Sequence, residues 1–456
     1  MARDLVDEQL ISSRDELVGW LEAGCKPQGP FRVGTEHEKI PFYRDDLSPL
    51  PYEGPTGVRA LLEGLRAGSG WESIEDSGAL IGLYDPERGA AISLEPGGQF
   101  ELSGAPLDTV HETRIELDAH FAALAPLCES FGVDFLDLGM SPLWRRDETP
   151  FMPKQRYRIM ARYMPKVGGL GLDMMFRTAT VQTNVDFASE ADMVAKFRLA
   201  LSLQPLFTAL FANSPFTDGK PNGFLSMRSQ IWTDTDPDRT GMLPFVFEPG
   251  MGFERYVDYA LDVPLYFVKR GDVYHDVAGA SFRDLLAGKL PQLPGEFATI
   301  SDWANHLSTI FPEVRLKRYM EMRGADVGPR SHILAFTALC AGLCYDAEAS
   351  AAAWDLVRRW TAEERAELRA AVPRAGLAAK IAGRSLVDLA RDILPLARDA
   401  LARRRRLDGE GRDETQYLEA LEAIAASGEN LAERRLALYR GAWKDSVRPA
   451  FRGCIF

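Results

Sequence analysis

The sequence is poor in cysteine and has no long apolar run. Its five cysteines are scattered, odd in number and never spaced as Cys-x-x-Cys, which argues against structural zinc and against a disulfide framework. The longest apolar stretch, residues 335–345, is about half of the roughly 20 residues that span a bilayer. The first residues also lack the basic and apolar regions of a signal peptide. We therefore predict a cytoplasmic protein with no membrane partner.

A net positive charge and the common phosphate-binding motifs are absent too. The chain has 53 Lys and Arg against 66 Asp and Glu, a net charge of −13, which argues against nucleic acid as a partner. It contains neither a Walker A motif nor Gly-x-Gly-x-x-Gly, so a nucleotide would have to be bound by other means. The hydrophobic share of 46% and the charged share of 26% are typical of a globular protein. Small anionic substrates remain possible where arginines cluster.

Two short acidic segments are the most informative feature of the sequence. One is Thr-Glu-His-Glu, which ends at Glu38, and the other is Leu-Glu-Pro-Gly-Gly-Gln-Phe-Glu, which ends at Glu101. Alternate side chains of a strand share a face, so Glu36 should point the same way as Glu38, with His37 facing away. Gln99 shares a face with Glu101 by the same rule. Each segment alone is typical of a solvated acidic strand, but carboxylates that converge in a core need a cation, and together the segments predict a magnesium site.

Residues 314–323 form an alternating cationic segment that is predicted to be one strand. Apolar residues fall largely on one face, and the other face carries Arg315, Lys317, Tyr319, Glu321 and Arg323. A half-exposed strand with cross-strand ion pairs explains this pattern without any function. The functional interpretation is a phosphate-binding wall, in which Glu321 is a further metal ligand and Arg323 grips phosphoryl oxygens bidentately. Magnesium ligands beside arginines are what phosphoryl transfer requires.

The remaining pattern predicts a mixed N-terminal part and a helical C-terminal part. Strict alternation over residues 178–187 predicts a strand whose polar face lines a cavity with Thr178, Thr180, Gln182 and Asn184. Further strands are expected over residues 31–42 and, as a hairpin, over 91–103. Helical periodicity covers residues 6–23, 54–67, 106–131 and 189–213. Strand signals vanish beyond Pro329, so we predict an α+β catalytic domain over residues 1–330 with a helical region, residues 331–456, packed on it.

Five longer segments carry a more specific signal. They are Arg32-Val-Gly-Thr-Glu-His-Glu-Lys39, Ile92-Ser-Leu-Glu-Pro-Gly-Gly-Gln-Phe-Glu-Leu-Ser103, Gly223-Phe-Leu-Ser-Met-Arg-Ser229, Arg239-Thr-Gly-Met-Leu-Pro244 and Phe311-Pro-Glu-Val-Arg-Leu-Lys-Arg318. These segments resemble those of the glutamate–cysteine ligase family of the plant and proteobacterial type, and the resemblance extends over roughly residues 15–445. It implies a glutamine-synthetase-like α+β fold, in which a curved, mainly antiparallel sheet forms an active-site funnel surrounded by helices.

The resemblance also implies the first step of glutathione biosynthesis. ATP would phosphorylate the γ-carboxylate of glutamate, the amine of cysteine would attack the acyl phosphate, and Mg²⁺ would bridge the phosphates. The implied partners are these small molecules, with the protein a monomer or a homodimer. Two alternatives remain open: an ATP-dependent carboxylate–amine ligase that joins glutamate to another amine, and a catalytically silent regulator that binds nucleotide.

The resemblance and the strand patterns assign candidate site residues by position. The metal candidates are Glu36, Glu38, Glu95, Gln99, Glu101 and Glu321. The ATP-binding candidates are Arg315, Lys317 and Arg323, and the catalytic candidates are Arg323, Lys317 and Arg228. The substrate-binding candidates are Arg228, Trp232, Tyr266, Arg156, Arg283 and Thr180. A packed aromatic or a surface arginine remains an open alternative for Trp232, Tyr266, Arg156 and Arg283.

Plant members of the family carry regulatory cysteines, and this chain departs from them there. The regulatory disulfides are expected to be absent, because the corresponding positions hold Arg114, Val277, Gln292 and Leu334. Cys340 and Cys344 lie one helical turn apart and are predicted to be buried small apolar residues rather than a redox switch.

Overall fold

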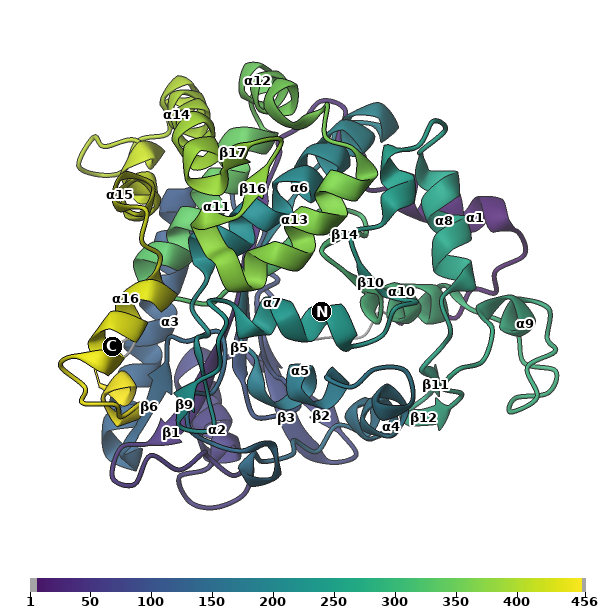
Figure 1. Ribbon diagram of the computed structural model, residues 1–456. Helices are drawn as coiled ribbons and strands as arrows, with labels where there is room; N and C mark the ends of the chain where they lie inside the picture. Colours follow the sequence, from purple (N-terminus) through teal and green to yellow (C-terminus); the bar gives the residue numbers. More distant parts are fainter. Residues whose placement is uncertain (1–5, 453–456) are drawn as a thin grey trace.

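The computed structural model describes residues 6–452 and is built around one nine-stranded sheet (Figure 1). Eight strands follow the order β14-β15-β7-β1-β5-β4-β3-β2, β6 pairs with the C-terminal end of β1, and every neighbouring pair is antiparallel. The strands are β1 (Val33–Tyr43), β2 (Glu72–Asp76), β3 (Ala79–Tyr84), β4 (Ala91–Leu94), β5 (Phe100–Ser103), β6 (Val133–Leu136), β7 (Thr180–Val185), β14 (Val314–Leu316) and β15 (Met320–Asp326). The α+β class expected from the sequence is confirmed.

Helices cover both sides of this sheet. They are α1 (Arg14–Glu22), α2 (Val58–Ser69), α3 (Val110–Phe131), α4 (Gln155–Tyr163), α5 (Gly171–Arg177), α6 (Glu190–Phe211), α7 (Met227–Ile231), α8 (Phe253–Asp262), α9 (Phe282–Leu286), α10 (Ile300–Ser308), α11 (Arg330–Cys344), α12 (Ala347–Val357), α13 (Ala362–Ala375), α14 (Leu386–Arg404), α15 (Glu419–Ser427) and α16 (Leu431–Arg440). One face of the sheet packs on α3, α6 and α11, and the other looks toward α4, α5 and α7 (Figure 1).

Four small two-stranded sheets lie outside the main sheet. They are β8 (Phe216–Thr217) with β9 (Lys220–Pro221), β10 (Thr240–Gly241) with β13 (Phe311–Pro312), β11 (Phe267–Arg270) with β12 (Val273–Asp276), and β16 (Lys380–Ile381) with β17 (Arg384–Ser385). The last pair lies within the C-terminal region, which otherwise contains only helices, turns and irregular segments from α11 to residue 452. The division at residue 330 stays a proposal.

Alternation along β1 sends two kinds of side chain to opposite faces of the sheet. Glu36 and Glu38 face a cavity, whereas His37 packs on the rings of His120 and Phe121 in α3, with both centroid distances at 5.9 Å. The expected orientation of His37 is therefore confirmed. Burial lowers the pKa of His37 well below its usual value, and Lys39 next to it adds to this effect, so this ring is a neutral core residue.

The segment 314–323 is a hairpin and not the single strand expected from its alternation. β14 and β15 are joined by a turn in which the Lys317 N–H donates to the Tyr319 carbonyl at 2.8 Å. Arg315 then lies directly opposite Glu321, so these two side chains still share a face. The expectation failed because the turn residues Lys-Arg-Tyr carry none of the Gly, Pro or Asn signals that mark a hairpin.

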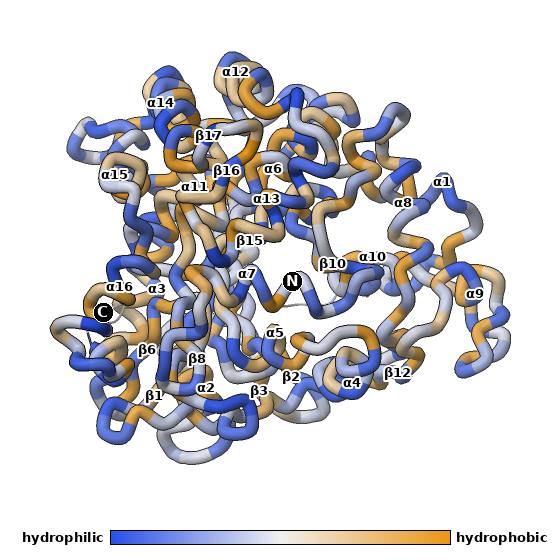
Figure 2. The backbone as a smooth tube through the Cα atoms, in the orientation of Figure 1, coloured by the Kyte–Doolittle hydropathy of each residue, from blue (hydrophilic) through white to orange (hydrophobic). Residues whose placement is uncertain are grey.

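Two helices look hydrophobic enough to raise the question of a membrane. By length and composition α6 could span a bilayer, and so could α11 with α12 if that pair, bent by 93°, were one span. However, 83% of the most apolar window of α6 is buried inside the fold, as expected for a core helix. Figure 2 shows α11 largely in hydrophobic colours, while α14, which packs on it, alternates between hydrophobic and hydrophilic residues.

The first helix begins later than its periodicity predicts. Residues 7–11 are extended and pair with the chain before and within α10: the Ile11 N–H donates to Ala298, and the Ser301 N–H donates to Asp7. The helix that follows starts at Arg14. The helix expected over residues 106–131 also starts later, at Val110, where Thr109 and Glu112 form a reciprocal capping box.

Candidate active site

A cavity of about 110 Å³ lies on the face of the sheet that carries the acidic residues. Its walls come from strands β1, β4, β5, β7, β13, β14 and β15 and from helices α4, α5, α7 and α10, and thus from segments far apart in the sequence. Of the residues singled out from the sequence, the cavity brings together Glu36, Glu38, Glu95, Gln99, Glu101, Arg156, Thr178, Thr180, Gln182, Arg228, Trp232, Arg315 and Arg323.

An acidic row crosses the floor of this cavity. Glu38 on β1 lies directly opposite Glu101 on β5, and the Ser93 hydroxyl donates to the Glu101 carboxylate at 2.6 Å. The Thr180 N–H donates to Glu38 at 3.1 Å. Burial raises the pKa of Glu38 well above its usual value, and the nearby charges of Glu95 and Glu101 raise it further. Like charges held opposite each other on neighbouring strands are unfavourable, so this row favours a bound cation.

Glu36 lies at the junction between the central cavity and a larger one of about 760 Å³. Its carboxylate accepts a hydrogen bond from the Asn184 side-chain amide at 2.8 Å. Burial raises the pKa of Glu36, and the charge of Glu321 contributes to the same shift. The larger cavity is lined by Lys26, Arg32, Tyr84, Asn184, Asp186, Arg318 and Tyr319, among other residues.

Gln99 was a metal candidate, but its side-chain amide is used by the β4–β5 turn. The side-chain oxygen accepts from the Gly97 N–H at 2.9 Å, and the side-chain nitrogen donates to the carbonyls of Met175 and Thr178. Gly98 in the same turn has φ of 87°, a conformation that favours glycine. Gln99 therefore holds the turn against the segment that enters β7.

Glu321 lies among cations rather than in the acidic row. Arg315 donates to it through Nε at 2.5 Å and through Nη2 at 2.9 Å, and Arg323 Nη1 lies 3.3 Å away. Burial alone would raise the pKa of Glu321, but Arg315, Lys317 and Arg323 together hold it well below its usual value. Its carboxylate orders these cations, and both of its oxygens are already occupied by arginine.

Arg228 projects from the short helix α7 and has one unused donor. Its side chain is 2% exposed, and Nη2 donates to the Arg323 carbonyl at 3.0 Å. Within residues 6–452, Nη1 has no hydrogen-bond partner. A buried guanidinium N–H that faces a polar cavity without an acceptor is costly, and an anionic ligand would satisfy it.

Besides Glu321, three sequence candidates are absent from the described lining of the central cavity. Lys317 lies in the β14–β15 turn, and burial together with Arg315 lowers its pKa to about 8. Tyr266 is buried, and its ring lies 3.7 Å from the Arg239 guanidinium. Arg283 is on the surface helix α9, where its Nε donates to Asp262 at 2.8 Å. The structure therefore places Tyr266 in the core and Arg283 in a surface ion pair, which were the alternatives left open for them.

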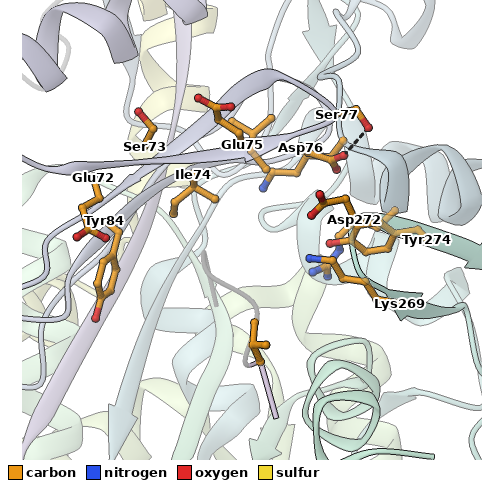
Figure 3. Close-up of a pocket in the computed structure, with 14 residues that line it drawn as sticks. Glu72, Ser73, Ile74, Glu75, Asp76, Ser77, Tyr84, Lys269, Asp272 and Tyr274 are labelled. Carbon is orange, nitrogen blue, oxygen red and sulfur yellow. Dashed lines mark hydrogen bonds between the residues drawn. The ribbon is translucent and has the colours of Figure 1, made fainter. Parts of the chain in front are cut away.

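A third cavity, of about 250 Å³, adjoins the central one and shares Lys154 and Arg156 with it. Figure 3 shows its two walls: β2, with Asp76 hydrogen-bonded to Ser77, and the β11–β12 hairpin, which carries Lys269 and Tyr274. Both signs of charge line this space, and we call it the vestibule.

Similarity to known proteins identifies the family of this chain. The model of glutamate–cysteine ligase family 2 matches residues 32–453. This chain belongs to that family. It is 52% identical over 444 residues to the chloroplastic glutamate–cysteine ligase of Arabidopsis thaliana, covering 97% of this chain and 83% of the relative. The chloroplastic glutamate–cysteine ligase B of Oryza sativa subsp. japonica is 51% identical, with 97% and 87% covered.

Solved structures of ligases share the fold of this family member at low identity. One is a glutamate–cysteine ligase from Francisella tularensis in complex with AMP, at 13% identity and a TM-score of 0.50, covering 93% of this chain and 89% of that one. Another is a bifunctional glutathione synthetase from Pasteurella multocida, at 14% identity and a TM-score of 0.50, covering 94% and 52%. These likenesses support the fold alone.

The comparison corrects the expected location. We predicted a cytoplasmic protein from the lack of signal-peptide features, but the relatives from Arabidopsis thaliana, Oryza sativa and Brassica juncea are all named as chloroplastic. The cytoplasmic assignment is therefore wrong on this comparison. Composition around the first residues does not identify a compartment.

The central cavity also has an apolar side that was not predicted from the sequence. Met160 of α4 and Met174 and Met175 of α5 line the central cavity, together with Phe311. No local pattern distinguishes these methionines from ordinary core residues, because their role depends on where two separate helices dock. Ser93 and Ser308 also line the cavity and were not predicted from the sequence.

Proposed function

We propose that this protein uses ATP to phosphorylate the γ-carboxylate of glutamate and then joins the acyl phosphate to the amine of cysteine. The observation that carries the proposal is the arrangement around Glu36: an acidic row and an arginine cluster face one cavity, which meets a second, larger cavity at this residue. Phosphoryl transfer needs two substrates to meet where charge is neutralised. The larger cavity suits the nucleotide, and the central cavity of about 110 Å³ suits the amino acids.

The acidic row fits a magnesium ion by its donor chemistry. Glu36, Glu38 and Glu101 offer the hard oxygen ligands that Mg²⁺ prefers, and their crowding is relieved by a cation. Within residues 6–452, no three acidic, His or Cys side chains are grouped so that they alone could hold a metal ion. Mg²⁺ commonly uses one or two carboxylates with substrate phosphates and water, so an open row is sufficient. When bound, the ion would neutralise the phosphate oxygens during transfer.

The cationic residues would act on the transferred phosphoryl group. Arg323 and Arg315 line the cavity, and both are fixed in place by Glu321. A guanidinium held in this way meets developing negative charge without first reorganising, which is a large part of electrostatic catalysis. Lys317 completes the cluster from the turn, 3.8 Å from Glu321.

The amino acids would be held by Arg228 and by the apolar side of the cavity. The unused Nη1 of Arg228 supports a contact with a substrate carboxylate. Trp232 lies beside it, with its ring centroid 5.9 Å from the Arg228 guanidinium carbon. The methionines of α4 and α5 would face the small thiol side chain of cysteine, since thioether sulfur packs well against apolar and soft groups.

A phosphate-release assay with ATP, Mg²⁺ and glutamate against a panel of amines tests this proposal. We expect release to require all three and to be fastest, by kcat/KM, with cysteine. A higher kcat/KM for another amine would favour a different carboxylate–amine ligase. No turnover with any amine would favour a silent nucleotide-binding regulator. Glu101→Gln is the matched variant, because it removes one charge of the acidic row while keeping the shape of the side chain.

The remaining expectations about partners belong to the same proposal. The net charge of −13 favours neither nucleic acid nor an anionic membrane surface as a partner. We expect a monomer or a homodimer, which light scattering coupled to size-exclusion chromatography would distinguish.

A further inference from the structure

We infer that Asp326 is a positioning residue that sets the direction of Arg228 through the hydroxyls of Ser214 and Ser226. The inference rests on the proposed role of Arg228 in holding a substrate carboxylate. Asp326 is 1% exposed at the end of β15 and is not among the described residues that line the cavities, so it acts through other groups.

Three hydrogen bonds converge on the Asp326 carboxylate. The Ser214 hydroxyl donates to Oδ2 at 2.6 Å, and the Asn213 N–H donates to the same oxygen at 2.9 Å. The Ser226 hydroxyl donates to Oδ1 at 2.9 Å. All of these partners are buried, and they come from the segments on either side of the 216–221 hairpin.

The Asp326 carboxylate determines which hydrogen bonds the two serine hydroxyls can form with other groups. A serine hydroxyl has one hydrogen to donate, and an ionised carboxylate can only accept, so both hydrogens point to Asp326. The lone pairs of the two serine oxygens are then free to accept hydrogen bonds from other donors. Ser214 Oγ accepts from the Arg228 N–H at 3.1 Å, and Ser226 Oγ accepts from the Ser229 N–H at 3.1 Å as the cap of α7. The first turn of α7 is thereby held over β15.

The same strand holds the far end of the Arg228 side chain. Arg228 Nη2 donates to the Arg323 carbonyl, three residues before Asp326 on β15. Arg228 is thus fixed at its backbone N–H through Ser214 and at one guanidinium nitrogen through Arg323. Nη1, which has no hydrogen-bond partner within residues 6–452, is left for a ligand.

A β-bulge explains why Asp326 faces this way. Met322 pairs with Thr183 and Ala325 pairs with Val181, so three steps along β15 match two along β7. The extra residue reverses the alternation, and Asp326 lies opposite Thr180, on the face that carries Glu321. Gly324 lies in the bulge, where an added Cβ would be 1.4 Å from the Gln204 side-chain nitrogen.

The backbone at Gly139 lies close to the Asp326 side chain and restricts its movement. An added Cβ at Gly139 would lie 2.5 Å from the Asp326 Cβ and 2.8 Å from its Oδ2, so only glycine leaves room there. The Gly139 N–H in turn donates to the Asn213 carbonyl at 3.0 Å. Asp326 therefore has little freedom to adjust if one of its partners is removed.

The test compares Asp326→Asn and Ser226→Ala with Arg228→Lys in the full-length protein. If Arg228 binds the glutamate carboxylate, Asp326→Asn and Ser226→Ala should each raise the glutamate KM roughly five- to a hundredfold, as expected for a lost buried polar partner, with the ATP KM changed by less than about twofold. The double variant Asp326→Asn/Ser226→Ala should raise it little beyond Asp326→Asn alone, because both act on one network. Asp346→Asn is the matched control, since Asp346 caps α12 through the Ala349 N–H and is not among the described residues that line the central cavity.

The outcomes separate this inference from the role of Arg228. An unchanged glutamate KM in Arg228→Lys would refute the carboxylate contact itself. A raised KM in Arg228→Lys together with unchanged glutamate KM values in Asp326→Asn and Ser226→Ala would refute the positioning role alone. Equal rises in the glutamate and ATP KM values, matched by Asp346→Asn, would show a general loss of stability instead. If Asp326→Asn does not fold, Ser226→Ala and Ser214→Ala carry the test, because each removes one hydroxyl only.

Discussion

Glu38→Gln should stabilise the protein while abolishing its activity. In the absence of a cation, Glu38 faces Glu101 across two neighbouring strands, and directly opposite Cβ atoms lie about 5 Å apart. With carboxylates about 6 Å apart and an effective dielectric constant of about 20, the repulsion is about 3 kcal/mol. Gln can still accept the hydrogen bond from the Thr180 N–H, so little is lost. We expect the free energy of unfolding to rise by about 1 to 3 kcal/mol.

The gain in stability from Glu38→Gln should increase as the pH rises. Burial, with Glu95 and Glu101, raises the pKa of Glu38, so between the unfolded pKa of about 4.3 and the raised folded pKa the folded state binds more protons. Wild-type stability contributed by this group is therefore lost as pH rises through that window. Glutamine does not titrate, so the advantage of the variant should be small near pH 4 and larger near pH 8.

Thermal unfolding in EDTA at several pH values, beside phosphate release at saturating Mg²⁺, measures both effects. Glu63→Gln is the control, because Glu63 is a surface carboxylate paired with Arg59 at 2.9 Å, where stability should change by less than about 0.5 kcal/mol. A variant that unfolds at a lower temperature than the wild type near pH 8 would refute the repulsion argument. Near-wild-type turnover would remove Glu38 from the site.

Three further predictions concern the arginine cluster, the bulge and the cysteines. Arg323→Lys should lower kcat by about tenfold to a thousandfold in the phosphate-release assay, because a point charge cannot replace a planar fork; an unchanged kcat would favour a purely structural ion pair. Gly324→Ala should lower the unfolding temperature in a thermal melt, since its Cβ would overlap Gln204, and a melt equal to wild type would show that the bulge can relax. Activity should not change between oxidised and reduced dithiothreitol: burial raises the pKa of Cys340 well above its usual value and that of Cys344 to about 12, and a reversible severalfold change would contradict this.

The faces of the central strands could be predicted from the sequence, and the turn of the cationic hairpin could not. Period-two alternation correctly placed Glu36 and Glu38 on one face, because β1 is long and regular. In the cationic segment alternation also runs through both arms of the hairpin, so it gives no sign of a reversal at Lys317. Arg315 and Glu321 nevertheless face the same way, because they pair directly across the hairpin. Their positions differ by six, an even number, so simple alternation gives the same answer.

Asp326 could not be assigned from the same alternation. Counting from Glu321 would place Asp326 on the opposite face of the sheet, which packs on α3, α6 and α11. A carboxylate there would be interpreted as a residue outside the strand. One extra residue at the bulge reverses that count, and such an irregularity depends on tertiary contacts, here the packing of Gly324 on Gln204. The roles of Ser214 and Ser226 follow only once the position of Asp326 is known.

Arg228, which we propose holds glutamate, is fixed in place from two sides. Asp326 of β15 anchors α7 from the sheet, and α13 of the C-terminal region anchors the same segment from outside. The Pro373 carbonyl, at the end of α13 where helix carbonyls lack partners, accepts from the N–H groups of Leu225 and Ser226 at 2.8 and 3.0 Å. Arg369 of α13 donates to the Ser229 carbonyl at 3.1 Å and pairs with Glu313.

Glu313 also connects α13 to Arg323, another of the catalytic candidates. Its carbonyl accepts from the Arg323 N–H at 3.2 Å, so one carboxylate residue joins α13 to the strand that carries Arg323. Removing the Glu313 carboxylate would leave Arg369 as an uncompensated buried charge. Removing the Arg369 guanidinium would leave Glu313 uncompensated in the same way. The helical region therefore contributes to the geometry of both arginines although it supplies no side chain to the described lining of the central cavity, and the position of Arg228 depends on residues from 214 to 373 folding together.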